Sequence, residues 1–463
     1  MTQQKELIPP GYAGQLADYI VSFSLDTTPP LVVDHARYLL LDLLGAALAG
    51  VDTPEAKAAL HAIAFMAPTG GQCTLWGTSK KSTPNGAALF NGIIAHAREL
   101  DDFGGADHSG AVVIPALLAV VDSNPTINGK TLLESVIVGY DVARRVLDSA
   151  GGYRPHNHSD GYHSTGTCGS FGAAAAVSKA LGLSVQETTW ALGLTGSYTG
   201  GTWAFTEDGA MSKRFNVGRA AETGLTAAFL AKSGFTGPAY IFEAKWGGFL
   251  GTYAREDVRP EALVKDLGLN YGIMRSGIKP YAACRDIHST LDVILEAKKV
   301  HGLTTENIAE IKVKLIPEMA QMIGSTTLPK NRFEAQLNLR YSIGVALTCG
   351  RAFIAEYEEP YLNMKEVLQG AELVKLIESP ELPFDSEPHI TITTNNGKTI
   401  EGHVDYASGA PQNPLQPDVI IDKFSSLASR VFPAQKYVQL QEKILAVQSL
   451  PDIREITSEL TLL

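Results

Sequence analysis

The residues best suited to chemistry lie in a glycine-rich stretch, Gly161-Tyr-His-Ser-Thr-Gly-Thr-Cys-Gly-Ser-Phe-Gly172, that runs directly into the alanine-rich segment 173–183. Glycines allow a ligand to approach the backbone closely, and a helix N-terminus offers unpaired N–H groups to an anion. His163 can exchange a proton near neutral pH, and Thr165 can donate a hydrogen bond. The stretch therefore predicts a site for an anionic ligand. A tightly packed helix start capped by a threonine is the alternative.

A second window combines carboxylates with a histidine. It follows the expected helix 85–98 and contains Glu99, Asp101, Asp102, Asp107 and His108. Carboxylates at the C-terminal end of a helix oppose the helix dipole, so local helix stability does not account for them. A histidine beside carboxylates is suited to general-base chemistry because the carboxylates tune its pKa. A solvated acidic loop is the alternative.

A cluster of cations precedes another helix of small residues. Lys213, Arg214 and Arg219 lie close together in a chain that is acidic overall. Lysine and arginine in such a cluster can bind a carboxylate or phosphate group. The alternative is a basic helix start exposed at the surface.

Three more candidates occur later in the chain. Arg285 and His288 are three residues apart, so on a helix they would share a face. Tyr341 lies in an otherwise apolar helical segment. A buried tyrosine in such a segment most often bonds to the backbone.

We expect neither a metal nor a cofactor. The sequence lacks the P-loop, G-x-S-x-G and H-E-x-x-H motifs. His156, His158 and His163 could bind a metal ion, although flexible histidine-rich loops often resemble such sites. Cys168 with His163 could form a thiol nucleophile, but a cysteine among small residues is typical of packing. The four cysteines are far apart, which argues against disulfides and against an iron–sulfur cluster.

Charge and hydropathy exclude several classes of partner. The 463 residues include 38 basic and 49 acidic side chains, for a formal net charge of −11. This balance argues against nucleic acid and against an anionic membrane surface. The apolar run 111–121 contains Pro115 and is too short to span a bilayer, and the first ten residues lack a signal-peptide pattern. We expect a cytoplasmic protein with a small-molecule partner.

Helices dominate the expected structure of the first part of the chain. Apolar residues recur at helical spacing in 32–48, and Gly50 follows as a stop signal. Helices rich in alanine and glycine are typical of helices packed on all sides. They are expected at 85–97, 132–147, 171–181, 185–196 and 219–233.

The pattern changes after residue 272. Residues 308–316 alternate apolar and polar positions, as a half-buried strand does, and 389–404 predict a hairpin with an Asn-Gly turn. Helices are expected at 286–300, 333–356, 364–377, 418–431 and 434–448. The expected fold is mainly α, with a large all-helical domain and an inserted smaller α/β lid domain. The expected ranges are 1–272 and 407–463 for the helical domain and 273–406 for the lid.

Taken in order, these windows resemble the MmgE/PrpD family, which includes 2-methylcitrate dehydratase, cis-aconitate decarboxylase and iminodisuccinate epimerase. The resemblance covers nearly the whole chain. It rests on residues 39–45, the Asp101-Asp102 loop, 165–169, Lys213 with Gly218, 234–238, 279–281, 409–414 and 423–424. It implies the fold described above, a homodimer without a metal, and an active site between the domains.

The resemblance also implies roles for individual residues. The matching catalytic positions are His108, His163, Lys213, His288 and Tyr341. Asp102 and Glu99 are expected to orient His108. The residues expected to contact the substrate are Glu99, Phe103, Thr165, Arg214 and Arg285. The chain departs from the decarboxylase pattern, because Glu99 replaces an aspartate, Phe103 replaces a threonine, and the loop 102–108 is about one residue short. The sequence after His108 also differs from the His-Pro-Ser-Asp pattern associated with the dehydratase.

The function implied by this resemblance is a cofactor-independent lyase that acts on a small di- or tricarboxylate. Loss of water, loss of CO₂ and epimerisation all form or quench a carbanion beside a carboxylate. Such a step requires cations on the carboxylates, a proton-transfer group near the carbon, and exclusion of water. An isomerase or epimerase of a dicarboxylate and a non-catalytic binding protein on the same fold are the alternatives.

Overall fold

The chain divides into two compact units in a computed structural model that describes residues 9–66, 71–124 and 126–462. The first unit comprises Met1–Ala97, Asp101–Gly277 and Gln416–Leu463, and the second comprises Arg98–Leu100 and Ile278–Leu415. The sequence had predicted the corresponding boundaries near residues 272 and 406. Within the described residues, no helix is long and apolar enough to cross a membrane.

The first unit is helical apart from a short pairing of β1 (Cys73–Thr74) with β2 (Lys81–Ser82). Its α-helices are α1 (Gly11–Ser22), α2 (Pro30–Gly50), α3 (Pro54–Met66), α4 (Pro84–Ala95), α5 (Gly110–Val121), α6 (Gly129–Ser149), α7 (Ser164–Thr167), α8 (Gly169–Ala180), α9 (Val185–Tyr198), α10 (Ser212–Lys232), α11 (Phe249–Tyr253), α17 (Pro417–Ala428), α18 (Ala434–Leu445) and α19 (Arg454–Thr457). This agrees with the helical pattern read from the sequence.

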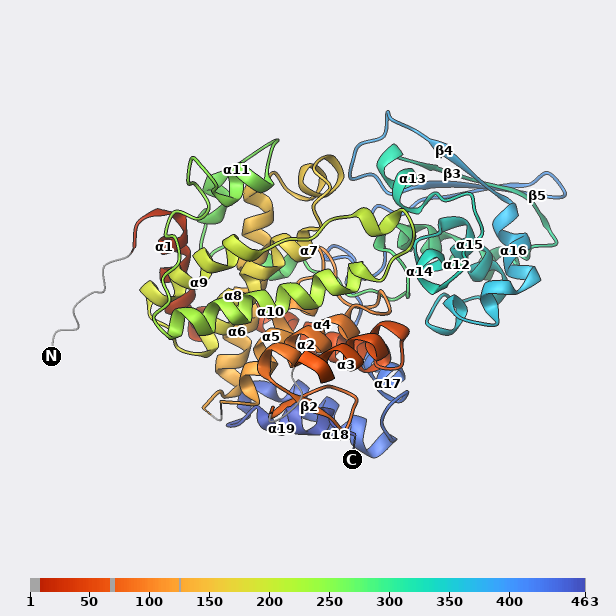
Figure 1. The fold of residues 1–463 in the computed structure, drawn as a ribbon. Helices are drawn as coiled ribbons and strands as arrows, with labels where there is room; N and C mark the ends of the chain where they lie inside the picture. The colour runs from red at the N-terminus through yellow and green to blue at the C-terminus, as the bar shows by residue number, and fades with distance from the viewer. Residues whose placement is uncertain (1–8, 67–70, 125, 463) are drawn as a thin grey trace. The chain divides into compact units, whose positions relative to one another are not determined.

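Helices α4, α5, α6, α8 and α10 form the centre of this unit (Figure 1). Their small residues let the backbones approach closely. A Cβ atom added at Gly172 of α8 would lie 2.5 Å from the carbonyl oxygen of Gly139 in α6. One added at Gly224 of α10 would lie 2.5 Å from the carbonyl oxygen of Ser170 in α8. Glycine is therefore required where these helices cross.

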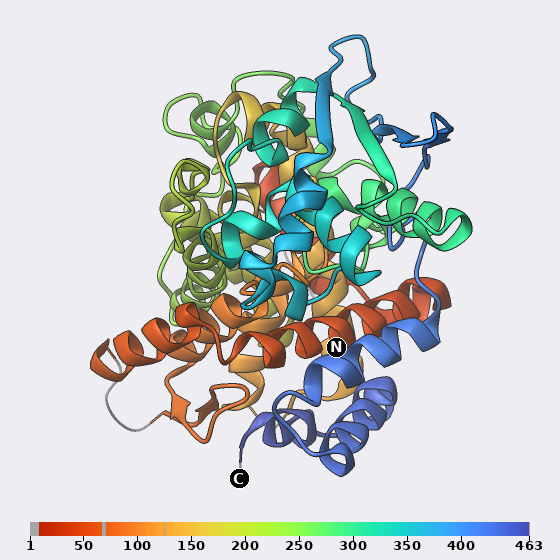
Figure 2. The same cartoon turned by 90° about the vertical axis from the view of Figure 1, so that its right-hand side faces the viewer.

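The C-terminal helices belong to the same unit as the N-terminal ones. Figure 2 shows α17 lying beside α2, with α18 next to it. Phe424 of α17 is fully buried, and its ring lies 3.2 Å from where a Cβ of Gly45 would stand. A buried ion pair of 2.6 Å joins Lys423 of α17 to Asp42 of α2.

The second unit combines helices with one sheet. Its helices are α12 (His288–His301), α13 (Pro317–Ile323), α14 (Arg332–Gln336), α15 (Leu339–Cys349) and α16 (Lys365–Glu372). Its strands are β3 (Ile308–Leu315), β4 (Val374–Glu378), β5 (His389–Thr394) and β6 (Thr399–Gly402), in the order β4-β3-β5-β6. Strand β4 is parallel to β3, and the other pairs are antiparallel.

Two expectations for this unit were wrong in detail. The helix predicted at 364–377 ends at Glu372, and β4 follows because Val374 pairs with Ile311 of β3 and is buried. The helix predicted at 333–356 is broken into α14 and α15. Asn338 caps α15 by accepting a hydrogen bond from the N–H of Tyr341, which starts a new helix there.

Candidate active site

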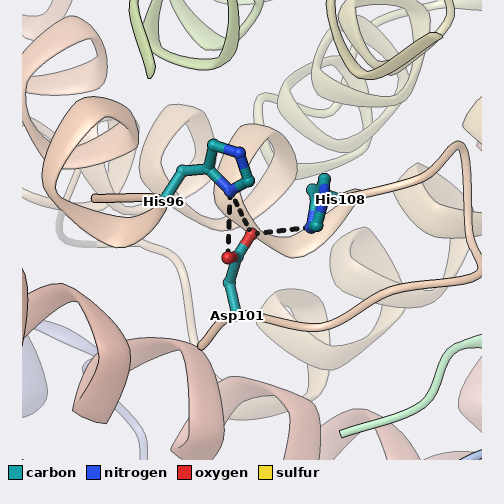
Figure 3. Close-up of side chains that lie close together, drawn as sticks. All are labelled: His96, Asp101 and His108. Atoms are coloured by element: carbon teal, nitrogen blue, oxygen red, sulfur yellow. Dashed lines mark hydrogen bonds and ion pairs between the residues drawn. The ribbon is translucent and has the colours of Figure 1, made fainter. Parts of the chain in front are cut away.

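The loop between α4 and α5 brings two histidines onto one carboxylate (Figure 3). The Nδ1 atom of His96, the last residue before the loop, lies 2.9 Å from each oxygen of Asp101. The Nδ1 atom of His108 lies 3.2 Å from Oδ2 of Asp101 and 2.9 Å from the backbone oxygen of Asp102. All three side chains are buried, and the two imidazole rings are 4.3 Å apart between centroids.

The surroundings of Asp101 and of its neighbour Asp102 shift their pKa values in opposite directions. Burial alone would raise the pKa of Asp101, yet the two imidazoles hold this pKa well below its usual value. Burial, together with the charge of Asp101, raises the pKa of Asp102 to about 8. Asp102 therefore keeps its proton at neutral pH, while Asp101 is ionised. The Asp102 carboxyl accepts the N–H of Gly110 at 3.0 Å, at the start of α5.

A third buried histidine approaches this loop from another segment. His163 lies directly before α7 and is fully buried. Its Nε2 atom lies 3.9 Å from Oδ2 of Asp107, whereas Nε2 of His108 lies 3.5 Å from Oδ1 of the same carboxylate. Thr165 donates a hydrogen bond of 3.4 Å to Asp107. The carboxylate of Asp107 thus lies between the two imidazoles.

The backbone at Asp107 adopts a conformation that favours glycine. Its φ angle is +74°, in the left-handed region. Strained residues of this kind cluster at functional sites, where the surrounding structure holds them. Here the N–H of His108 also donates to Oγ1 of Thr165 at 3.3 Å, which ties the strained loop to α7.

Two of the three predicted cations, Lys213 and Arg214, lie in the first turn of α10 and are buried, whereas Arg219 is partly exposed and pairs with Glu222. The ammonium of Lys213 is 5.9 Å from the ring centroid of Trp203. The same indole contacts the ring of His163, with centroids 5.1 Å apart. Lys213 and His163 therefore share one aromatic neighbour. Arg214 instead lies 3.9 Å from the carboxylate of Glu55.

The remaining predicted residues of the first unit have structural contacts. The backbone of Phe103 exchanges two hydrogen bonds with that of Gly277, and its side chain is buried. Asp102 contacts His108 through its backbone oxygen, and the carboxylate that reaches the ring is that of Asp101. Asp102 was expected to orient His108; its contact with the ring is through the backbone oxygen, while its side chain accepts the N–H of Gly110 at the start of α5.

In the second unit, the predicted residues are also engaged. The carboxylate of Glu99 forms a buried ion pair of 3.4 Å with Lys279. Arg285 binds both carboxylate oxygens of Glu387. Nε2 of His288 lies 3.1 Å from the carbonyl oxygen of Ala283. The hydroxyl of Tyr341 donates a hydrogen bond of 2.8 Å to the backbone carbonyl oxygen of Glu356. Catalytic or substrate-binding roles for these residues stay predictions.

Among the residues that the structure describes, one group of three side chains could hold a metal ion: His96, Asp101 and His108. The histidines named as possible ligands from sequence do not form such a group there. His156 contacts Oγ1 of Thr167 at 2.6 Å, and burial lowers the pKa of its ring to about 4. Burial also raises the pKa of Cys168 to about 12, which opposes its use as a thiolate nucleophile.

Two features define the class of protein: a mainly helical first unit with converging histidines, and a smaller second unit that combines helices with one sheet. The chain matches the MmgE/PrpD N-terminal domain over residues 14–261 and the MmgE/PrpD C-terminal domain over residues 281–448. It belongs to the MmgE/PrpD family, which confirms the resemblance inferred from its motifs.

Several curated relatives match over nearly their whole length. A cis-aconitate decarboxylase-like protein of Aspergillus oryzae is 28% identical over 96% of this chain and 95% of its own length. The cis-aconitate decarboxylase of Homo sapiens is 26% identical over 93% of this chain and 90% of its own length. A 2-methylcitrate dehydratase of Escherichia coli O157:H7 is 22% identical over 93% of this chain and 92% of its own length.

Proposed function

We propose that this enzyme is a cofactor-independent lyase that moves a proton at a carbon next to a carboxylate of a small di- or tricarboxylate. The lyase class has the support of relatives named as decarboxylases and dehydratases. The observation that carries the proposal is the convergence of His108 and His163 on the carboxylate of Asp107, at 3.5 and 3.9 Å. Two buried imidazoles that converge in this way can exchange a proton with a ligand bound beside the Asp107 carboxylate.

Lys213 supplies the positive charge that such a ligand needs. The chain carries a net charge of −11, so an anionic substrate requires a local cation. Lys213 is buried and shares Trp203 with His163. A lysine in this position binds a substrate carboxylate and stabilises the charge that develops beside it. The aromatic rings of Trp203 and Phe205 flank His163 and limit the access of water.

A substrate panel tests the proposal. The purified protein is incubated with cis-aconitate, 2-methylcitrate, citrate and iminodisuccinate, and products are followed by NMR. Decarboxylation or dehydration supports the lyase, whereas conversion of iminodisuccinate alone would replace it by an epimerase. Turnover should survive exhaustive chelation. Loss of activity that one divalent ion restores would overturn cofactor independence.

The proposal extends to assembly and compartment. Large apolar side chains are exposed on the first unit at Tyr198, Phe215, Phe235, Tyr240 and Trp246. These side chains are candidate contacts for the homodimer that the family resemblance implies. Light scattering should give twice the chain mass of 49.5 kDa, and a monomer at micromolar concentration would contradict it. The four free cysteines are compatible with the reducing cytoplasm.

A further inference from the structure

The hydrogen bonds around His108 and His163 place the two rings in opposite tautomers. We infer that His108 carries the substrate proton on Nε2, while His163 stays neutral and donates a hydrogen bond through its Nε2–H. Asp101, which His96 holds in place, keeps a hydrogen on Nδ1 of His108. Asn216 donates to Nδ1 of His163 and so keeps the hydrogen of that ring on Nε2. This inference rests on the proposed proton transfer and assigns a separate role to each ring.

The state of His108 follows from its Nδ1 contacts. Nδ1 lies 2.9 Å from the carbonyl oxygen of Asp102 and 3.2 Å from Oδ2 of Asp101. Both oxygens accept hydrogen bonds, so Nδ1 bears a hydrogen, and in the neutral ring Nε2, which lies 3.5 Å from Oδ1 of Asp107, then has the lone pair. When Nε2 takes a proton, the buried charge of Asp101 stabilises the resulting imidazolium, as the aspartate of a serine-protease triad does.

His96 holds the carboxylate that orients His108. Its Nδ1 lies 2.9 Å from both oxygens of Asp101, so it donates a hydrogen bond to that side chain (Figure 3). This donor fixes the direction of the carboxylate and favours its ionised form. A metal ion bound through the same atoms would need lone pairs on both Nδ1 atoms. The hydrogen-bonded relay and a metal ion bound through these two atoms are therefore mutually exclusive states of the site.

The state of His163 follows from Asn216. The Nδ2 atom of Asn216 lies 3.3 Å from the carbonyl oxygen of Thr202 and 3.3 Å from Nδ1 of His163. The carbonyl can only accept, which identifies Nδ2 as the amide nitrogen. Nδ1 of His163 is therefore an acceptor, and Nε2 bears the hydrogen. An N–H aimed at Nδ1 opposes a second proton there, so the ring stays neutral.

The two states complete one chemical step. The C–H bond next to the substrate carboxylate breaks, its proton bonds to Nε2 of His108, and the electron pair moves into the carboxylate to form an enediolate. An enediolate oxygen accepts the hydrogen bond from Nε2 of His163. In a dehydration the electron pair then returns from the enediolate, the C–O bond at the neighbouring carbon breaks, and the hydroxide leaves as water with the proton held on Nε2 of His108. The titratable and charged groups facing the rings are His96, Asp101, Asp102, Asp107 and, across Trp203, Lys213.

Neutron diffraction from crystals of the free enzyme in D₂O tests the tautomers directly. The expected deuterium positions are Nδ1 of His108, Nδ1 of His96 and Nε2 of His163. Deuterium on Nε2 instead of Nδ1 of His108, or on Nδ1 of His163, would overturn the inference. This readout needs no turnover, so it can fail while the proposed reaction stands, and the reaction can fail while the tautomers stand.

Two variants test the positioning residues by kinetics. Asp101→Asn should lower kcat about 10²–10⁴-fold and move the ionisation of His108 in the pH profile to lower pH, because the neighbouring charge is lost. Asp52→Asn, an exposed aspartate paired with Arg430, is the matched control and should leave activity unchanged.

Asn216→Asp provides the second variant, at a half-buried position. A carboxylate at this place accepts a hydrogen from Nδ1 of His163, so the ring can take a second proton. We expect kcat to fall about a hundredfold and a second ionisation to enter the pH profile. Circular dichroism confirms folding of each variant. Wild-type kinetics in either folded variant would contradict the inference.

Discussion

The adjacent carboxyl groups of Asp101 and Asp102 are both buried but have different protonation states at neutral pH. Asp101 faces two imidazoles and is ionised, whereas Asp102 is buried beside that charge and keeps its proton. Tyr140 lies next to Asp102, and burial raises the pKa of its hydroxyl well above its usual value, so this tyrosine adds no charge. Of these two adjacent carboxyl groups, only Asp101 therefore places a negative charge beside His108.

The protonated state of Asp102 predicts a pH dependence of stability. Its pKa is about 8 in the folded chain against an ordinary 3.8, so the folded state binds more protons between these values. The free energy of unfolding should therefore fall as pH rises from about 4 to 8, by a few kcal/mol from this residue. Asp102→Asn should flatten that slope in urea titrations at pH 5 to 8. An unchanged slope would show that Asp102 is ionised when folded.

Removal of the Lys213 ammonium tests the binding of the substrate carboxylate. Lys213→Ala leaves that carboxylate desolvated and without its cation, at a cost of roughly 2–4 kcal/mol in the transition state. We expect kcat/KM to fall about a hundredfold or more, with the thermal unfolding curve retained. Lys80→Ala, at an exposed position, is the control. Equal kcat/KM values for the two variants would show that Lys213 does not bind the substrate.

Sequence reasoning found part of this site. His108, His163 and Lys213 stand in windows whose glycines and charges are unusual for helix ends, and the structure places all three as buried residues of the first unit. His96 gave no signal, because it follows an apolar helix and lies five residues from its partner Asp101. The contact depends on the path of the loop, and spacing along a chain does not specify such a path.

At the scale of elements, the close crossing of helices α6, α8 and α10 was foreseeable from their alanines and glycines. Strand β4 was not, because Val374, Leu376 and Ile377 continue a helical pattern that starts at Lys365. Parallel pairing with β3, more than 50 residues earlier, decides the conformation of this segment. Such a partner lies outside any local window.

A single methyl group tests the packing of α8 against α6. Gly172→Ala would place Cβ 2.5 Å from the carbonyl oxygen of Gly139 and 2.8 Å from Cβ of Ala143, so the helices must separate. We expect a loss of about 1–3 kcal/mol in the free energy of unfolding, measured by urea denaturation. Gly251→Ala in α11 meets nothing within 4 Å and should be neutral or slightly stabilising. Equal stability of the two variants would refute the close crossing.

At the scale of the whole molecule, the fold class and the family were correctly predicted from composition, periodicity and ordered motifs. The ends of the chain contribute to one unit, since Gln416–Leu463 belongs with Met1–Ala97 and Asp101–Gly277. The chain has a net charge of −11, so an anionic ligand needs a positive side chain at its binding site. The buried Lys213 is the proposed source of that charge. Substrate identity depends on side chains rather than on this architecture.

Turnover in D₂O tests directly whether the enzyme transfers a proton at the carbon next to a substrate carboxylate. The protein converts its preferred acid from the substrate panel, and NMR locates deuterium in the product or in re-isolated substrate. Proton transfer at the carbon next to the carboxylate predicts that deuterium appears at that carbon. It also predicts that His108→Gln and His163→Gln each lose at least about a hundredfold in rate, with exposed His61→Gln unchanged as the control. Product carbons that all remain protonated in D₂O, or full activity in both glutamine variants, would contradict it.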